Sequence, residues 1–379
     1  MMRNLLGPLS DIVQNPLVTD IAVTSNGRIW ADYGNGMVEK TLESGSLTAP
    51  MVRDFAIQLC ASLGKRLDDA CPIADASSPE GLRVHAVLSP IVSRGASISI
   101  RLPHHHLATL DELAKRRMFP QEWKPLLEAI VASKQSVLIC GGTGTGKTTL
   151  VKALLAAVPA SERVVLVEEI RELEHNVHHN SESLVVRESN VEGAGEITLS
   201  DLIRATVRMR PDRIVLGECR GEEVADLMRA LNSGHKGSIA TVHADSIERV
   251  PARICALGLL AGIDIPAMSM LAAGAFDVVL HVERTEKSRH IAQIGTLSVD
   301  SNGRLQGQVL TRWDGHGEAQ YADGFMTWYE SFRQGLAQYH PSPSEIQTFS
   351  NDNDTEEISD STIEFARVVQ GGTHGIHGV

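Results

Sequence analysis

The amino-acid sequence predicts an α/β protein in which a parallel sheet with covering helices follows a smaller α+β domain. From residue 124 onward, segments with helical periodicity alternate with short β-branched segments, as in a parallel sheet. Residues 1–102 instead combine a hairpin signal, extended segments and one longer helical segment. The chain has 379 residues, 42% hydrophobic and 22% charged, so two globular domains can each bury a core.

The N-terminal domain, 1–102, is predicted from short segments. Asn26 and Gly27 lie between two extended runs, and this dipeptide is a strong signal for a hairpin turn. A helical segment covers about residues 50–66. Residues 84–92 and 96–102 are rich in β-branched residues and predict two further strands.

Residues 103–123 predict a linker that carries a short helix. Thr109 is the expected N-cap, with Glu112 three residues later as in a capping box. The run His104–His106 could bind a metal, but a solvated linker is the favoured interpretation.

In the second domain, 124–310, segments with helical periodicity alternate regularly with strand-like segments, and this alternation predicts a parallel sheet. A closing hairpin is expected over 277–297. The strand-like segments are 136–141, 163–169, 213–218 and 238–244, and the helical segments are 126–134, 148–158, 199–209 and 223–234.

The longest apolar segment, 254–276, has about the length of a membrane span. Asp264 and Pro266 lie at its centre, and an Asp in mid-bilayer costs roughly 3 kcal/mol on insertion scales. We therefore expect two buried helices, broken at Asp264–Pro266, rather than a span.

Charge and cysteine content indicate which kinds of protein this chain can be. Lys and Arg number 35 against 47 Asp and Glu, and this balance of −12 argues against a large nucleic-acid face. The N-terminus has no signal-peptide pattern, and a reducing cytoplasm is the expected location. The region 311–379 is polar, and we expect disorder from about 340. No C-x-x-C pair occurs among the five cysteines, Cys60, Cys71, Cys140, Cys219 and Cys255.

The segment GGTGTGKT fits the phosphate-binding loop pattern G-x-x-x-x-G-K-[ST] in full, between an apolar strand and a helix. Glycines let successive backbone N–H groups point at a phosphate. Lys147 is expected to reach the β- and γ-phosphates, and Thr148 to bind Mg²⁺. The predicted nucleotide-binding residues are Gly141, Gly142, Thr143, Gly144, Thr145, Gly146, Lys147, Thr148 and Thr149.

Two further strands end in carboxylates. Glu218 ends the strand 213–218, and Glu168 and Glu169 end the strand 163–169. Ligands of open α/β sheets bind outside the carboxyl ends of the strands, so these groups could hold the metal and activate water. A charged start of the following helix is the alternative explanation for Glu168 and Glu169.

The segment VEEIREL, with the stretch from NVEGAGEITL to SIATVHADS, resembles the secretion-superfamily ATPases. These are the hexameric motors of type II and type IV secretion and of type IV pili. The resemblance is closest to the TadA/CpaF branch, which assembles tight-adherence (Flp) pilus structures and includes conjugation-associated ATPases. It extends from about residue 5 to 297, and implies that 124–310 is a RecA-like P-loop ATPase domain.

The resemblance also implies roles for the acidic residues and histidines. Glu168 matches the catalytic carboxylate of the family, while Glu169 stands where Asp is usual, so either could be the principal base. Glu218 matches the Walker B carboxylate. His235 and His243 match the histidine box, although Lys236 and Asp245 depart from the family pattern.

Arginines, together with His235, are implied to sense phosphate or to act between subunits. Arg83 and Arg101 match positions that reach nucleotide phosphates, and the remaining members of the set are Arg204, Arg208, Arg210 and Arg220.

Metal binding by the histidines is disfavoured, because the resemblance supplies carboxylates for Mg²⁺. The run with Glu174, His175, His178 and His179 lacks a clear fourth ligand. His243 is expected to sense the γ-phosphate, and a buried structural histidine is the alternative.

The sequence thus predicts a Mg²⁺-dependent ATPase with ATP as substrate, assembled as a homo-hexamer. A motor of this family would associate peripherally with the inner face of the plasma membrane through an integral platform protein. The alternatives are an ATPase for conjugation or DNA transfer, and a nucleotide-gated scaffold without turnover. Direct sequence-specific nucleic-acid binding is not expected.

Overall fold

The computed structural model describes residues 5–336 except 35, 43–44, 79–80, 103–107, 174–179, 188, 190–193 and 286–287. Two compact units divide the chain: unit 1 is Met1–His106 with Ile170–His175, and unit 2 is Leu107–Glu169 with Asn176–Val379. The histidine run 104–106, the loop 174–179 and the tail from 340 lie outside the described residues.

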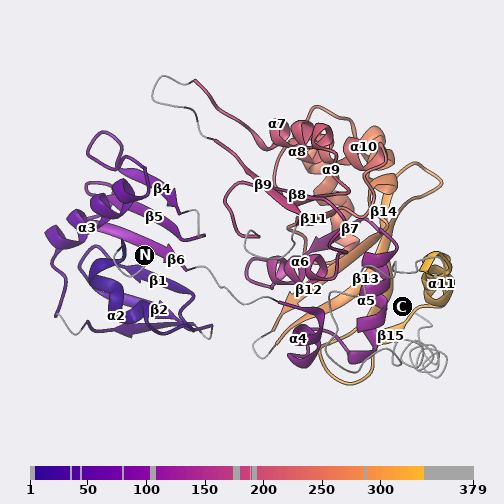
Figure 1. Ribbon diagram of the computed structural model, residues 1–379, viewed down its shortest axis with the longest axis horizontal. Helices are drawn as coiled ribbons and strands as arrows, with labels where there is room; N and C mark the ends of the chain where they lie inside the picture. The colour runs from indigo at the N-terminus through magenta and orange to yellow at the C-terminus, as the bar shows by residue number, and fades with distance from the viewer. Residues whose placement is uncertain are drawn as a thin grey trace. The chain divides into compact units, whose positions relative to one another are not determined.

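Unit 1 contains a six-stranded antiparallel sheet in the order β3-β2-β1-β6-β5-β4 (Figure 1). The predicted hairpin is confirmed, since β1 and β2 pair antiparallel across a turn in which Gly27 has φ 85°. One side of α3 (Ala49–Ser62) is buried with the sheet, close to the predicted helix 50–66. The strands are β1 Asp20–Val23, β2 Ile29–Asp32, β3 Met37–Lys40, β4 Ile73–Ser77, β5 Arg83–Leu88 and β6 Ala96–Arg101.

Unit 2 contains a nine-stranded sheet in the order β15-β14-β13-β12-β7-β11-β10-β8-β9. The run from β12 to β9 is parallel, and β13, β14 and β15 continue it antiparallel. The parallel strands are β7 Val137–Cys140, β8 Val164–Glu168, β9 Ser181–Val185, β10 Arg213–Cys219, β11 Ile239–Val242 and β12 Val278–Arg284. The antiparallel strands are β13 Arg289–Val299, β14 Leu305–Arg312 and β15 Gln320–Tyr321.

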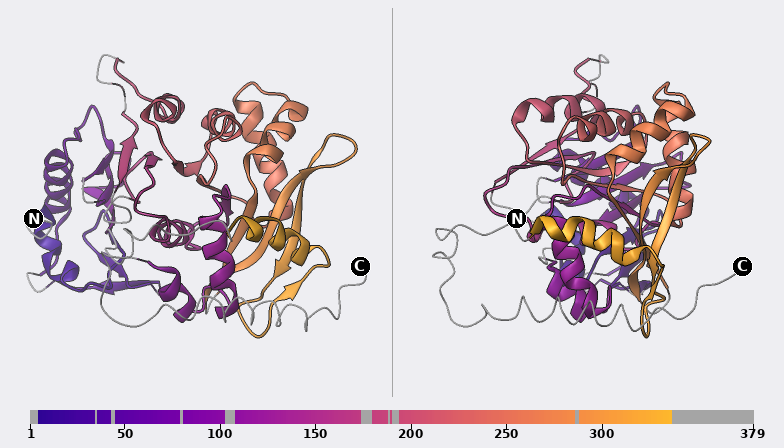
Figure 2. Two further views of the ribbon diagram at one scale, coloured as in Figure 1. Left: turned by 45° about the vertical axis from the view of Figure 1, so that its right-hand side comes forward. Right: turned by 90° about the vertical axis from the view of Figure 1, so that its right-hand side faces the viewer.

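Helices pack in two groups against this sheet (Figures 1 and 2). One group is α7 (Leu199–Thr206), α8 (Glu223–Asn232), α9 (Val250–Leu260) and α10 (Ile265–Ala275), which share a core with the central strands. The other group is α4 (Leu110–Lys115), α5 (Lys124–Ala132), α6 (Lys147–Ala156) and α11 (Phe325–Leu336), which contact one another. A mostly parallel sheet that packs against two groups of helices confirms the predicted α/β class.

Two segments outside the predicted domain 124–310 also belong to unit 2. The helix α4 packs on α5 and α6, with Thr109 accepting a hydrogen bond from the Glu112 N–H at its N-terminus. The helix α11 packs on α5, and Trp123 Nε1 donates to the Tyr321 hydroxyl at 3.0 Å. Aromatic side chains therefore hold residues 320–331 to the unit.

The apolar segment 254–276 forms parts of two helices, α9 and α10, as predicted. Asp264 is the N-cap of α10 and accepts from the Ala267 N–H at 2.8 Å. The expectation that both helices are buried is wrong for one side of the pair, because Leu260 is 68% and Met270 73% exposed. Among the described residues, no helix combines the length and apolar character needed to cross a membrane.

Candidate functional site

The loop between β7 and α6 has the backbone geometry of a phosphate cradle. Gly141 has φ 154°, and a Cβ there would lie 2.3 Å from the Val282 carbonyl oxygen of β12. Gly146 has φ 102° at the N-cap of α6, a conformation that L side chains rarely adopt. These positions require glycine, and the N-terminus of α6 provides the positive end of a helix dipole to an anion.

Lys147 lies over this loop. Its side chain is buried, and Nζ donates to the carbonyl oxygens of Gly141 and Gly142, both at 2.8 Å. Thr145 Oγ1 donates to the same Gly142 oxygen at 3.0 Å, and Arg289 Nε donates to the Gly144 oxygen at 2.9 Å. The ammonium group is thus held beside the N–H groups that would bind a phosphate.

Carboxylates and a histidine follow the neighbouring strands at the same edge. Glu218 lies near the end of β10, and His243 directly follows β11, which pairs with both β10 and β7. His243 Nε2 contacts Glu218 Oε1. Arg220 donates from Nε to Glu218 Oε2 at 2.8 Å and from Nη1 to Glu169 Oε2 at 2.6 Å, so one guanidinium joins two carboxylates.

The pKa of His243 is affected by its neighbours. Partial burial lowers its pKa first, the Lys147 charge lowers it further, and Glu218 opposes both. A lowered pKa keeps the imidazole neutral at neutral pH, so His243 acts as a hydrogen-bonding group there rather than as a fixed cation. Lys147, Glu218 and His243 therefore form one interacting set at the carboxyl edge of the sheet.

Glu168 is the most buried of the predicted carboxylates, with 4% of its surface exposed. Its side chain packs over Gly217, where a Cβ would lie 3.2 Å from Glu168 Cγ. Thr241 Oγ1 donates to the Gly217 carbonyl at 2.5 Å and holds that backbone in place. The absence of a side chain at Gly217 therefore leaves room for the Glu168 side chain.

Glu223 and Arg289 are two contributors that the sequence interpretation missed. Glu223 Oε1 accepts from the N–H groups of Arg220 at 2.5 Å and Gly221 at 2.8 Å, and so fixes the turn after β10. An acid in the first turn of α8 was a usable signal, because such acids commonly satisfy free N–H groups. The Arg289 contact offers no such signal, since it joins residues 145 positions apart.

Some predicted residues do not reach this edge. His235 precedes β11, at the amino edge of the sheet, where its Nδ1 lies 3.0 Å from the Ala230 oxygen. Arg204 pairs with Asp226 at 2.8 Å on the α7–α8 surface. Arg208 and Arg210 are exposed just before β10 begins. The structure therefore does not place these four side chains beside the phosphate loop of their own unit.

Arg83 and Arg101 lie opposite each other on β5 and β6 of unit 1. Arg83 contacts the Glu172 carboxylate, and Arg101 Nε donates to Asp20 Oδ1 at 2.9 Å. The hydrogen bond to Asp20 raises the pKa of Arg101. The two arginines thus occupy paired positions on neighbouring strands of this sheet.

The oxygen ligands that Mg²⁺ prefers are present at the carboxyl edge. The Thr148 hydroxyl is in the first turn of α6, and the Glu218 carboxylate is 20% exposed. Among the described residues no group of three or more His, Cys, Asp or Glu side chains converges on a metal position. This donor set fits a metal held chiefly by nucleotide phosphates, with few protein ligands.

Comparisons with known proteins show a family match over most of the chain. The model of the family described as type II/IV secretion system protein matches residues 4–295. A candidate conjugal transfer protein of Mycobacterium tuberculosis is 40% identical over 314 residues, covering 81% of this chain and 88% of the relative. The type IV secretion system protein PtlH of Bordetella pertussis is 30% identical over 292 residues, covering 70% and 86%.

A solved structure shares the fold. The X-ray structure of the Legionella pneumophila ATPase DotB has a TM-score of 0.53 at 16% identity, and the match covers 97% of this chain and 87% of that chain.

Proposed function

We propose that this chain, which belongs to the type II/IV secretion system protein family, is an ATP-hydrolysing motor subunit of a secretion or pilus-assembly machine. The observation that carries the proposal is the set formed by Lys147, Glu218 and His243 at one sheet edge. A phosphate-binding lysine, a carboxylate and a hydrogen-bonding imidazole are the groups that phosphoryl transfer to water requires.

Each group has a distinct role in the proposed reaction. Lys147 and the loop N–H groups bind the β- and γ-phosphates, and Thr148 and Glu218 bind Mg²⁺, partly through water. Bound Mg²⁺ neutralises phosphate charge. Glu168 or Glu169 accepts a proton from the attacking water, and His243 donates a hydrogen bond to an oxygen of the γ-phosphate. Arg220 holds Glu169 and Glu218 in position through its two hydrogen bonds.

Finer assignments rest on the family resemblance. We place the chain in the TadA/CpaF branch and propose a homo-hexamer, which a membrane platform protein recruits to the inner face of the plasma membrane. Arg83 and Arg101 are proposed to reach nucleotide phosphates. Three exposed arginines and the half-buried His235 are proposed to contact a neighbouring subunit: Arg204, Arg208, Arg210 and His235.

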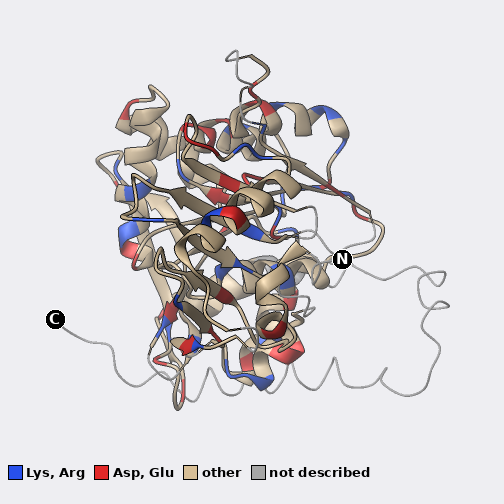
Figure 3. Ribbon diagram, turned by 90° about the vertical axis from the view of Figure 1, so that its left-hand side faces the viewer, with Lys and Arg blue, Asp and Glu red and all other residues tan. Residues whose placement is uncertain are grey.

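A role in conjugation is the second candidate, because the relative at 40% identity is described as a candidate conjugal transfer protein. Such a motor need not touch nucleic acid itself. Lys and Arg are interspersed with Asp and Glu along the ribbon (Figure 3), and the net charge is −12. Both observations favour force transmission through a protein partner over direct binding to DNA.

Steady-state phosphate release by the full chain, with and without Mg²⁺, tests the proposal. Glu168→Gln removes a buried carboxylate and should lower kcat by about a hundredfold while ATP affinity is kept. Glu182→Gln, on the exposed side of β9, is the matched control and should hydrolyse ATP at the wild-type rate. ATP binding without any turnover by the wild type would favour a nucleotide-gated scaffold instead.

A further inference from the structure

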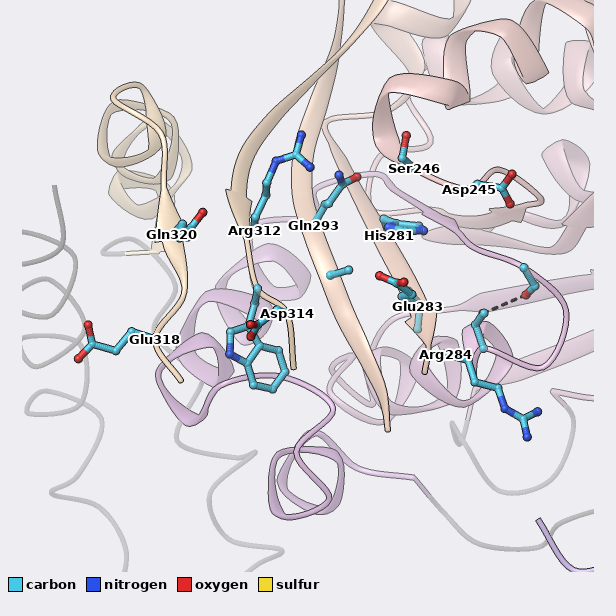
Figure 4. A pocket seen from close by; sticks show the side chains of 15 residues that line it. Asp245, Ser246, His281, Glu283, Arg284, Gln293, Arg312, Asp314, Glu318 and Gln320 are labelled. Atoms are coloured by element: carbon cyan, nitrogen blue, oxygen red, sulfur yellow. Dashed lines mark hydrogen bonds between the residues drawn. The ribbon is translucent and has the colours of Figure 1, made fainter. Parts of the chain in front are cut away.

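The phosphate loop packs against the end of β12. Gly141 lies against the Val282 carbonyl oxygen, which leaves no room for a Cβ there. Arg284, the last residue of β12, places its Nη1 3.3 Å from where a Cβ at Gly144 would lie. Arg284 lines the pocket drawn in Figure 4, and its guanidinium points away from His281 there. The end of this strand therefore contacts the backbone of two loop glycines.

Arg289, the first residue of β13, contacts the same loop in two ways. Its Nε donates to the Gly144 carbonyl oxygen at 2.9 Å. Its methylene stem lies beside the end of the loop, because a Cβ at Gly146 would be 3.7 Å from Arg289 Cδ. The Met118 methyl group lies 3.4 Å from the same Cβ position. The polar and the apolar parts of Arg289 thus both face the loop.

The hydrogen bond from Arg289 fixes the direction of one peptide unit. The peptide between Gly144 and Thr145 is trans, so its C=O and N–H point in opposite directions. A guanidinium that holds the Gly144 carbonyl therefore directs the Thr145 N–H to the opposite side of the chain. Thr145 is held as well, because its side chain is buried and its Oγ1 donates to the Gly142 oxygen. In a loop of this pattern, such N–H groups are the ones that bind phosphate.

Gly144 is the loop residue at which such a restraint matters most. It is exposed and has φ 72°, a conformation that glycine adopts about as readily as the ordinary one. Without a contact from a neighbouring strand, this peptide unit would have several orientations of similar energy. A hydrogen bond that selects one of them reduces the conformational entropy that is lost when a ligand binds.

The same bond contributes little to the stability of the fold. It joins atoms at the surface, and water can replace both partners in the unfolded chain. Removal of the Arg289 side chain should therefore change the loop more than it changes the folded state.

We propose that Arg289 is a positioning residue that preorganises the phosphate loop for nucleotide binding. This role rests on the proposed function, since it assumes that the loop binds nucleotide phosphates. Arg289 acts through the Gly144 carbonyl and needs no contact with the nucleotide. Arg284 brings a second positive charge to Gly144, but among the described residues it forms no hydrogen bond with the loop.

Fluorescence titration of the full chain with N-methylanthraniloyl-ADP tests the proposal. Arg289→Ala should raise the Kd by about tenfold, because one loop N–H is no longer held in line with a charged phosphate. The KM for ATP should rise by the same factor, with kcat within about threefold of wild type. The loop holds phosphate in the ground state and in the transition state alike, so the loss is one of uniform binding.

Two other arginines separate the hydrogen bond from the charge. Arg284→Ala removes a cation beside the same glycine without removing a bond to the loop, so it should raise the Kd by less than about threefold. Arg304→Ala, exposed at the turn after β13, should leave the Kd as in wild type. The melting temperature of each variant should stay close to that of wild type.

An Arg289→Ala Kd within about twofold of wild type would overturn the proposal. Equal losses in Arg284→Ala and Arg289→Ala would also overturn it, because charge alone would then explain the effect. A weaker affinity that comes with a clearly lower melting temperature would show that Arg289 is structural.

Binding of the ADP probe is measured without turnover, so the two proposals can fail separately. Wild type that binds the probe but does not hydrolyse ATP, with weaker binding by Arg289→Ala, would keep the positioning role and remove the proposed function. Normal hydrolysis by wild type, with an unchanged Kd in Arg289→Ala, would do the reverse.

Discussion

His243 is the residue whose substitution best distinguishes a catalytic role from a structural one. It contacts Glu218 and is influenced by the Lys147 charge, so its interactions should differ between bound ATP and the transition state. We expect His243→Ala to bind ATP nearly as wild type does and to lower kcat by about a hundredfold.

Melting temperature, ATP affinity and kcat measured on one preparation check this expectation. His316→Ala, an exposed loop histidine, is the control and should leave all three unchanged. A His243→Ala protein that melts early but keeps full kcat per folded molecule would show that the histidine is structural.

Residues within contiguous motifs could be predicted from the sequence, because local backbone geometry sets their positions. Lys147 and Thr148 follow directly from the glycine pattern and the helix that succeeds it. The contacts of Arg289 with Gly144 and of Glu169 with Arg220 depend on how distant segments pair in the sheet, and nothing in the local sequence encodes that.

The helix pair α9–α10 provides a prediction for a single element. Asp264 caps α10 by accepting from the Ala267 N–H, so Asp264→Ala should lower the free energy of unfolding by about 1 kcal/mol. Glu222 holds the N-cap position of α8 without a side-chain cap hydrogen bond, so Glu222→Ala is the matched control. Urea denaturation measures both, and equal effects would mean that the cap does not stabilise α10.

The hairpin of β12 and β13 should make unfolding dependent on pH. Burial lowers the pKa of His281 and His290 in the folded protein, whereas the unfolded chain regains a pKa near about 6.5. The unfolded state therefore binds more protons as the pH falls through about 6.5, and stability is lost in that direction.

Replacing His290 by Leu should reduce the change in the urea midpoint between about pH 7.5 and 5.5. The variant cannot take up that proton on unfolding. A His290→Leu protein with an unchanged slope would show that this histidine does not carry the pH dependence.

Elements with long, clear periodicity were predictable, and short or irregular ones were not. The segments of α3, α6 and β10 carry their own pattern of apolar residues. The strands β9 and β15 have few buried side chains, so their hydrogen-bonding neighbours define them. The helix α11 lies in a region that composition marks as polar, and a few buried aromatic residues such as Phe325 and Tyr329 hold it in place.

At the scale of the whole molecule, the proposed ring predicts that subunits do not act independently. Arg208 and Arg210 are exposed at the amino edge, away from the phosphate loop of their own unit, as expected for groups that act on a neighbour. Co-assembling wild type with Lys147→Ala should therefore lower ATP hydrolysis by more than the fraction of variant subunits. Strict proportionality across a series of mixing ratios would indicate independent sites.

The most direct test of the central claim is the rate of Mg²⁺-dependent phosphate release by Lys147→Ala. Lys147 Nζ lies on the loop carbonyls, where its charge would offset the γ-phosphate. The account predicts a fall of at least about a hundredfold in kcat, with the melting temperature nearly unchanged and with Lys115→Ala hydrolysing as wild type. A Lys147→Ala rate within about twofold of wild type would contradict the account, because catalysis would then not pass through the phosphate loop.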